Sequence, residues 1–226
     1  MVRILTAALC ASLALSPAPA AAPSLPDADP AMWVVNDRDT VIFLFGTFHA
    51  LDGKSDWFND EVETAFAASD ELVLETIVPD AVGAAGRSSR KQARRHPVAP
   101  GASFLATSRM AIDAGRARGM QVDKGADQVL RKAAEAAGKP VEGLEAFDEQ
   151  LALFARIPAA PGSPGPAHNL FAPQRMAAMM EWMQAGWNRG DQQVFGKVVA
   201  QLEQSSPETY RLMFTERNAH WAKWIA

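Results

Sequence analysis

The sequence predicts an α/β fold, with a mixed, mainly parallel central sheet, flanking helices and a helical insertion. An apolar run at 40–45 is followed by a loop, by apolar residues at helical spacing over 57–68, and by a second apolar run at 71–75. This order of strand, loop, helix and strand is typical of parallel strands joined by a crossover helix. The chain has 226 residues, 48% of them hydrophobic, and is long enough to bury one core around such a sheet.

The first predicted strands form a hairpin over residues 32–45. Two apolar runs, MWVV and TVIFLF, are separated there by the turn formers Asn36-Asp37-Arg38-Asp39. The second run is continuous rather than alternating. We therefore expect its strand to lie in the interior of a sheet, covered on both faces.

The rest of the chain is mainly helical in pattern, with one further strand at 140–145. Gly138 lies between a predicted helix and this strand, a normal transition from helix to strand. Residues 79–120 are predicted to form a variable insertion. Its basic cluster at 87–96 is either an anion-binding patch or a solvated helix. Residues 158–173 contain five prolines and predict an irregular Pro/Gly-rich loop. The predicted helices after residue 100 span 103–118, 127–137, 147–157, 174–188, 192–204 and 207–226.

Residues 1–20 have the pattern of a cleaved secretory signal peptide, with one basic residue, an apolar centre and a small-residue end. We therefore expect a bacterial exported protein, periplasmic or secreted, with no stable membrane insertion after cleavage. An uncleaved membrane anchor and a lipid anchor on Cys10 are the alternatives. Cys10 is the only cysteine, so its removal would exclude thiol chemistry and disulfides.

Composition and absent motifs exclude several classes of function. The formal net charge of −4 provides no basic surface for DNA or RNA, so no nucleic-acid partner is expected. The sequence contains no GxGxxG, P-loop, GxSxG or HExxH motif. Nucleotide binding, the nucleophile of α/β-hydrolases and zincin chemistry therefore have no support.

Three polar residues are expected at the carboxyl ends of strands, where ligands collect in open α/β sheets. His49 follows the strand at 40–45, Glu75 closes the strand at 71–75, and Glu145 closes the later one. An imidazole and two carboxylates can bind a divalent cation that activates water. They can equally serve as a metal-free general base with an orienting carboxylate. Gly46 is expected to let the backbone turn tightly and approach a ligand.

A resemblance to a known family rests on three stretches of this sequence. They are PAMWVVNDRDTVIFLFGTFHALDGKSDWFNDEVETAFAASDELVLE, then AAGKPVEGLEAFDEQLALF, and then ERN at 216–218. Together they resemble the TraB/GumN proteins, which are similar to the Tiki proteases and, more remotely, to ChaN and erythromycin-esterase-like proteins. The resemblance covers most of residues 31–157 and, more loosely, the helical end, and it implies a single α/β domain over 21–226.

The resemblance implies a metal-dependent hydrolase built around two GxxH motifs and acidic residues, with peptide-bond cleavage in the Tiki branch. Here the first GxxH is Gly46-Thr47-Phe48-His49, and Glu75 and Glu145 match acidic positions of the family. Catalytic roles are therefore expected for His49, Glu75 and Glu145, with His49 and Glu75 as ligands of Mn²⁺, Zn²⁺ or Co²⁺. The expected substrate is a peptide or a small molecule. Supporting structural roles are expected for Gly46, Asp127, Arg217 and Asn218.

A second GxxH in this family normally follows the helix that carries Arg217 and Asn218. In this sequence Gly165-Pro166-Ala167-His168 matches only by letter, since no strand precedes it. We therefore expect the domain to be incomplete at its C-terminal end. Two hypotheses follow: an exported metal-dependent hydrolase or peptidase, and a non-catalytic periplasmic binding protein or inactive fragment.

Overall fold

The computed structural model describes residues 24–79, 109–157 and 173–225. The expected signal peptide with Cys10, most of the expected insertion with its basic cluster, and the Pro/Gly-rich loop with His168 lie outside these residues. The strands are β1 Met32–Asn36, β2 Val41–Phe45, β3 Leu72–Thr76 and β4 Val141–Glu145. The named α-helices are α1 Asp60–Ala68, α4 Ala126–Ala137, α5 Phe147–Arg156, α6 Pro173–Trp187, α7 Gln192–Ser205, α8 Pro207–Tyr210 and α9 Glu216–Ile225.

The predicted mixed α/β class is confirmed, and the described strands form two small sheets rather than one. In the first sheet, β1 and β2 are antiparallel, with Met32 opposite Phe45, as the predicted hairpin requires. In the second, β3 and β4 are parallel, with Leu72 opposite Val141. Helix α4 leads into β4 through Gly138, which has a φ of +69° and ends the helix as predicted.

The prediction that the strand at 41–45 lies inside a sheet is wrong for the described part of the chain. There β2 pairs with β1 alone, and its other edge has no strand beside it. Val41 and Leu44 on β2 are exposed, as are Trp33 and Val34 on β1. A continuous apolar run indicates that a strand can be buried on both faces. Tertiary packing decides whether other elements cover it.

A core of aromatic and aliphatic side chains lies beneath the loop that follows β2. Phe48 and Leu51 are buried there, one on each side of His49 in the sequence. Trp187 packs on them from the end of α6, with its ring centroid 6.5 Å from that of Phe48 and 5.6 Å from that of Trp57. Leu51 also exchanges two backbone hydrogen bonds with Gln121. The loop that carries His49 is therefore held by buried side chains and by main-chain pairing.

The helix expected from Trp57 begins later, at Asp60. Trp57 is buried in the core, and Asp56 pairs through its backbone with the chain before β1, donating to Pro26 and accepting from Ala28. These contacts keep residues 56–58 out of the helix. The boundary was therefore moved by core packing and not by helix propensity.

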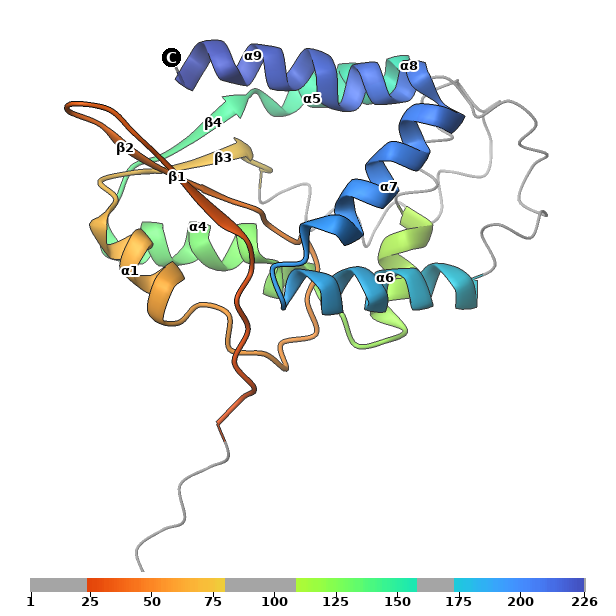
Figure 1. Ribbon diagram of the computed structural model, residues 1–226, viewed down its shortest axis with the longest axis horizontal. Coiled ribbons are helices and arrows are strands. Elements are labelled where there is room, and N and C mark those ends of the chain that lie inside the picture. The colour runs from red at the N-terminus through yellow and green to blue at the C-terminus, as the bar shows by residue number, and fades with distance from the viewer. Residues whose placement is uncertain (1–23, 80–108, 158–172, 226) are drawn as a thin grey trace, which may run out of the picture.

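The C-terminal segment is helical, as predicted, and runs as α8, a π-helical turn over Arg211–Thr215, and α9. In Figure 1, α9 crosses above the arrowhead ends of β3 and β4. The other predicted helices agree with the structure to within about two residues at each end, and residues 109–116 of the helix expected at 103–118 are described as helical. Among the described helices, none has the length and apolar character needed to cross a membrane.

Candidate functional site

His49 forms a pair with Asp127 at the start of α4. The Nδ1 atom of His49 lies 3.2 Å from Oδ1 of Asp127. The His49 side chain is 68% exposed, whereas that of Asp127 is 20% exposed. A carboxylate that engages Nδ1 places the ring proton there and leaves Nε2 for other contacts. The pair therefore presents an oriented imidazole at the protein surface.

The electrostatics of the pair favour the charged forms of both groups. The contact of Nδ1 with Asp127 raises the pKa of His49 above its ordinary value of 6.5, against the opposing effect of desolvation, and the negative charges of Asp127 and Glu75 act in the same direction. The positive charge of Arg217 opposes them. Burial acts to raise the pKa of Asp127, but the close contact and charge of His49 prevail and lower it.

Gly125 lets the start of α4 approach the backbone of His49. A Cβ atom at this position would lie 2.6 Å from the carbonyl carbon of His49 and inside contact distance of its oxygen. The next residue, Ala126, donates its N–H to the Phe48 carbonyl at 3.0 Å. The family resemblance pointed to Asp127, but neither Gly125 nor the pairing with His49 was predicted. A glycine two residues before the expected helix at 127–137 is the signal that was available.

Gly46 has no backbone conformation or protein contact that requires glycine, and its expected approach to a ligand stays a prediction. Its φ is not positive, and a Cβ atom would meet its nearest neighbour, the Ala31 carbonyl oxygen, at an ordinary 3.7 Å. Its backbone is instead used for hydrogen bonding. The N–H donates to the Ala31 carbonyl at 3.2 Å, and the carbonyl accepts the indole N–H of Trp187 at 2.6 Å. Gly46 therefore fastens the end of β2 to the core.

Glu75 and Glu145 lie side by side at the carboxyl ends of β3 and β4, as predicted, and Arg217 bridges them from α9. The guanidinium donates to Glu145 through Nη2 at 2.6 Å and through Nε at 3.2 Å, and to Glu75 through Nη2 at 2.9 Å. Gln150 donates to Glu145 at 2.9 Å. Arg217 also stacks over Trp221, with its Cζ atom 4.4 Å from the ring centroid.

Burial strengthens the ion pairs in the cluster formed by Glu75, Glu145 and Arg217. The side chains of Arg217 and Glu145 are 9% and 10% exposed, whereas Glu75 is 44% exposed. Burial acts to lower the pKa of Arg217, but the hydrogen bonds and charges of the two glutamates raise it. Both oxygens of Glu145 are engaged by a cation, so only Glu75 keeps a substantial surface open to solvent.

The predicted site residues thus fall into two neighbouring groups. Their charges act on one another, since both Glu75 and Arg217 influence the pKa of His49. Asn218 is exposed on α9 and belongs to neither group. Within the described ranges, no three His, Cys, Asp or Glu side chains are arranged to hold a metal ion. A metal on His49 and Glu75 therefore stays a prediction.

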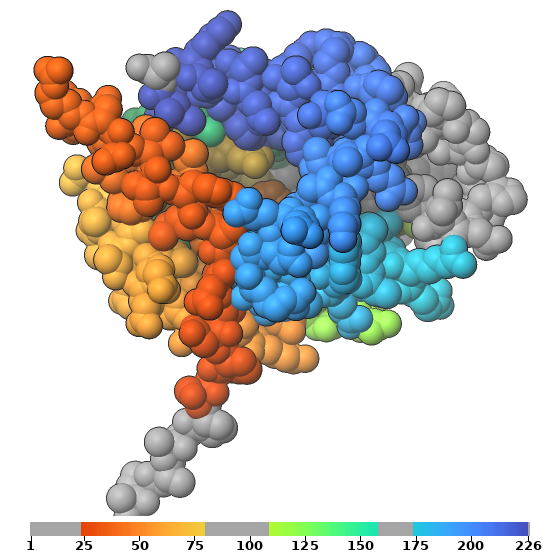
Figure 2. All heavy atoms as spheres, viewed as in Figure 1, coloured from red at the N-terminus to blue at the C-terminus, as the bar shows by residue number. Residues whose placement is uncertain are grey.

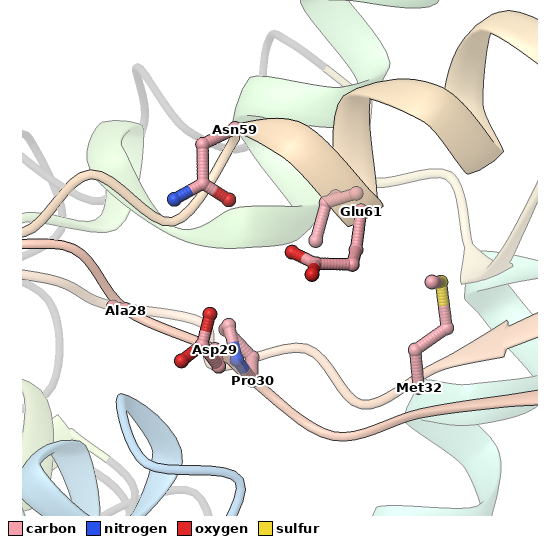
Figure 3. A pocket seen from close by; sticks show the side chains of 7 residues that line it. Ala28, Asp29, Pro30, Met32, Asn59 and Glu61 are labelled. Carbon is pink, nitrogen blue, oxygen red and sulfur yellow. The ribbon is translucent and has the colours of Figure 1, made fainter.

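Two cavities lie near the hairpin. One, of about 330 Å³, is lined by Trp33, Gly46, Thr47, Trp187 and Phe195, together with Ala31, Gly190, Asp191 and Gln192. The other, of about 260 Å³, lies between the chain before β1 and the start of α1, where Asn59 and Glu61 point toward the segment with Asp29 and Pro30 (Figure 3). Figure 2 also shows a hollow between the dark blue C-terminal helices and the orange hairpin, with the yellow segment that contains β3 at its floor.

Substitution of Gly125 by alanine is expected to destabilise the protein, because the Cβ atom would displace the His49 backbone. We expect urea unfolding to show a loss of about 1–3 kcal/mol in the free energy of unfolding. Gly196→Ala is the matched control. Gly196 lies inside α7 with open space around it, so alanine there should stabilise the protein by roughly 0.5–1 kcal/mol. Equal effects of the two substitutions would contradict the close approach at Gly125.

Substitution of Arg217 by methionine would leave Glu145 buried without its cation. The free energy of unfolding is expected to fall by about 3 kcal/mol. Arg118→Ala removes an exposed ion pair with Glu181 and should cost less than about 1 kcal/mol. The double variant Arg217→Met/Glu145→Met should recover part of the loss, because neither charge is then left buried. A double variant as unstable as Arg217→Met would count against this account.

The pKa of His49 is expected to lie above 6.5 and to fall toward that value in Asp127→Asn, as measured by NMR titration of the ring. The control is Asp123→Asn, which removes an exposed carboxylate from the preceding 3₁₀ turn and should leave the titration of His49 unchanged. Because folding raises the pKa of His49, the protonated ring stabilises the folded protein. This contribution is complete below pH 6.5 and is lost as the pH rises through the pKa of His49 in the folded protein. An unchanged titration in Asp127→Asn would disprove the pairing.

The comparisons with known proteins give one finding. The model of the TraB/PrgY/gumN family matches residues 31–95 and 85–226. Searches of curated proteins and of solved structures gave no match. The matched segments include both His49 and the cluster around Arg217. This chain therefore belongs to the TraB/PrgY/gumN family.

Proposed function

We propose that this chain is a hydrolase that cleaves peptide bonds, acts outside the cytoplasm after removal of residues 1–20, and uses His49 as its reactive group. The observation that supports the proposal is the pair formed by His49 and Asp127, in which a mostly exposed imidazole is oriented by a partly buried carboxylate. Such an arrangement favours general-base catalysis, because the base reaches the substrate while the carboxylate fixes its tautomer and direction.

The proposed chemistry follows from the two ring nitrogens of His49. With the proton of the neutral ring on Nδ1, Nε2 accepts a proton from a water molecule. The water oxygen bonds to the carbonyl carbon of the substrate, and the imidazolium then donates its proton to the leaving nitrogen as the C–N bond breaks. Asp127 and the half-exposed Glu75 stabilise the imidazolium through their negative charges. Glu145 is assigned to positioning, since Arg217 engages both of its oxygens.

The family resemblance implies a divalent metal such as Mn²⁺, Zn²⁺ or Co²⁺. Nε2 of His49 suits one ligand of such an ion, because metal-binding histidines commonly hold a carboxylate on the other nitrogen. The described residues do not complete a set of three ligands. The mechanism above therefore uses only the side chains of this chain, and metal dependence is left to experiment.

The proposal is tested by hydrolysis of fluorogenic peptides by the purified chain, with Mn²⁺, Zn²⁺, Co²⁺ or a chelator added. His49→Ala is expected to lower kcat by about 100-fold or more, the contribution typical of a general base. Asp127→Asn should lower kcat less strongly. His220→Ala changes an exposed histidine on α9 and should have no effect. Hydrolysis that persists in His49→Ala would refute the role given to this residue.

A second candidate function is a non-catalytic binding protein, and the cluster around Arg217 favours it. A cation of the chain itself already neutralises Glu145 and engages Glu75, which are two of the three expected catalytic groups. Isothermal calorimetry with each metal on wild type and His49→Ala separates the candidates. Metal-dependent heat that is lost in His49→Ala supports the metal-dependent hydrolase. A folded chain without hydrolysis or metal-dependent heat supports the binding protein.

A further inference from the structure

The 330 Å³ cavity beside the end of β2 has walls of aromatic rings. Trp33 contributes from β1, Trp187 from the end of α6 and Phe195 from α7. Gly46 and Thr47, three and two residues before His49 in the chain, also line the cavity. The volume lies at the lower end of the range for ligand pockets, roughly 300–1,000 Å³. It therefore suits one or two apolar side chains better than a large cofactor.

The cavity is lined mainly by apolar surface, and two of its polar groups are already engaged, so it offers little to an ionic ligand. The indole N–H of Trp187 donates to the Gly46 carbonyl. The carboxylate of Asp191 accepts the N–H of Gln193 at 3.0 Å, which caps α7. Trp187 is only 4% exposed, whereas Trp33 is 46% exposed. One wall is thus rigid, and the side chain of Trp33 is free to pack against a ligand.

An extended backbone can bind beside this cavity. In the described part of the chain β1 pairs with β2 alone, so the other edge of β1 has N–H and C=O groups available. Ala31, directly before β1, and Trp33, the second residue of β1, both line the cavity. A free strand edge next to a side-chain pocket is the arrangement by which proteins add a peptide as a further strand: main-chain bonds supply affinity and the pocket supplies specificity.

We propose that this cavity binds an aliphatic or aromatic side chain of an extended peptide whose backbone pairs with the free edge of β1. The assignment of this peptide as substrate rests on the hydrolase function proposed above. Thr47 precedes His49 by two residues, so their Cα atoms are at most about 7.6 Å apart. One or two extended peptide residues cover that distance. The bond to be cleaved therefore lies one or two residues from the bound apolar side chain.

Binding is measured by calorimetry and tryptophan fluorescence, using blocked pentapeptides that differ only in a central Leu, Phe, Ala or Asp. The Leu and Phe peptides are expected to bind about tenfold or more tightly than the Ala peptide, because they bury a larger apolar side chain. Ala31→Leu fills the cavity and should abolish the preference. Val34→Ala changes an exposed side chain on the same strand and should retain it. Trp33→Ala removes an exposed part of the cavity wall and should weaken the preference. It provides a second test of the cavity if Ala31→Leu does not fold.

The outcomes separate this proposal from the proposed catalytic activity. His49→Ala should keep the preference in binding while losing hydrolysis. Preferential binding without hydrolysis by wild type refutes the hydrolase and leaves the peptide site standing. Equal binding of the Leu and Asp peptides, or a preference unchanged in Ala31→Leu, overturns the peptide site. It is also overturned if sedimentation reveals a dimer that Ala31→Leu disrupts, since a second copy of the chain would then occupy the cavity.

Discussion

The close approach of Gly125 to the backbone of His49 is the contact on which the candidate site depends. It brings the first turn of α4 against the loop after β2, so that Ala126 donates to Phe48 and Asp127 reaches the imidazole. The loop cannot yield easily, because Phe48 and Leu51 on either side of His49 are buried in the core. An exposed histidine thus obtains a constant orientation from contacts that are themselves buried. Such preorganisation is what a reactive group needs.

Arg217 plays the corresponding role at the other half of the site. One guanidinium joins the ends of two parallel strands to the C-terminal helix, over residues that are more than 70 apart in the sequence. Because Arg217 and Glu145 are both nearly buried, the cluster holds α9 in one position. The π-helical turn Arg211–Thr215 directly precedes Glu216 and Arg217, and Arg217 donates to the Met213 carbonyl inside it. Turns of this kind often mark functional positions in helices.

Most of the secondary structure could be predicted because it follows from local sequence patterns. The hairpin follows from two apolar runs around a cluster of turn formers. Helix α4 follows from helical spacing, and β4 from the transition to a strand after the C-cap glycine Gly138. The environment of β2 could not be predicted in this way, since a continuous apolar run does not state which element covers it. The start of α1 was likewise shifted by the burial of Trp57. The convergence of Glu75 and Glu145 was predictable because parallel strands place their carboxyl ends at one edge.

The sequence by itself determined the mixed α/β class, the order and approximate bounds of the elements, family membership, and the choice of His49, Glu75 and Glu145 as candidates. Only the tertiary structure decided which partner each of them has. His49 pairs with Asp127, and the two glutamates pair with Arg217. These contacts join segments about 70 to 140 residues apart in the sequence. Propensity and periodicity act over a few residues. Ion pairs and close backbone approaches such as that of Gly125 are set by how distant elements pack.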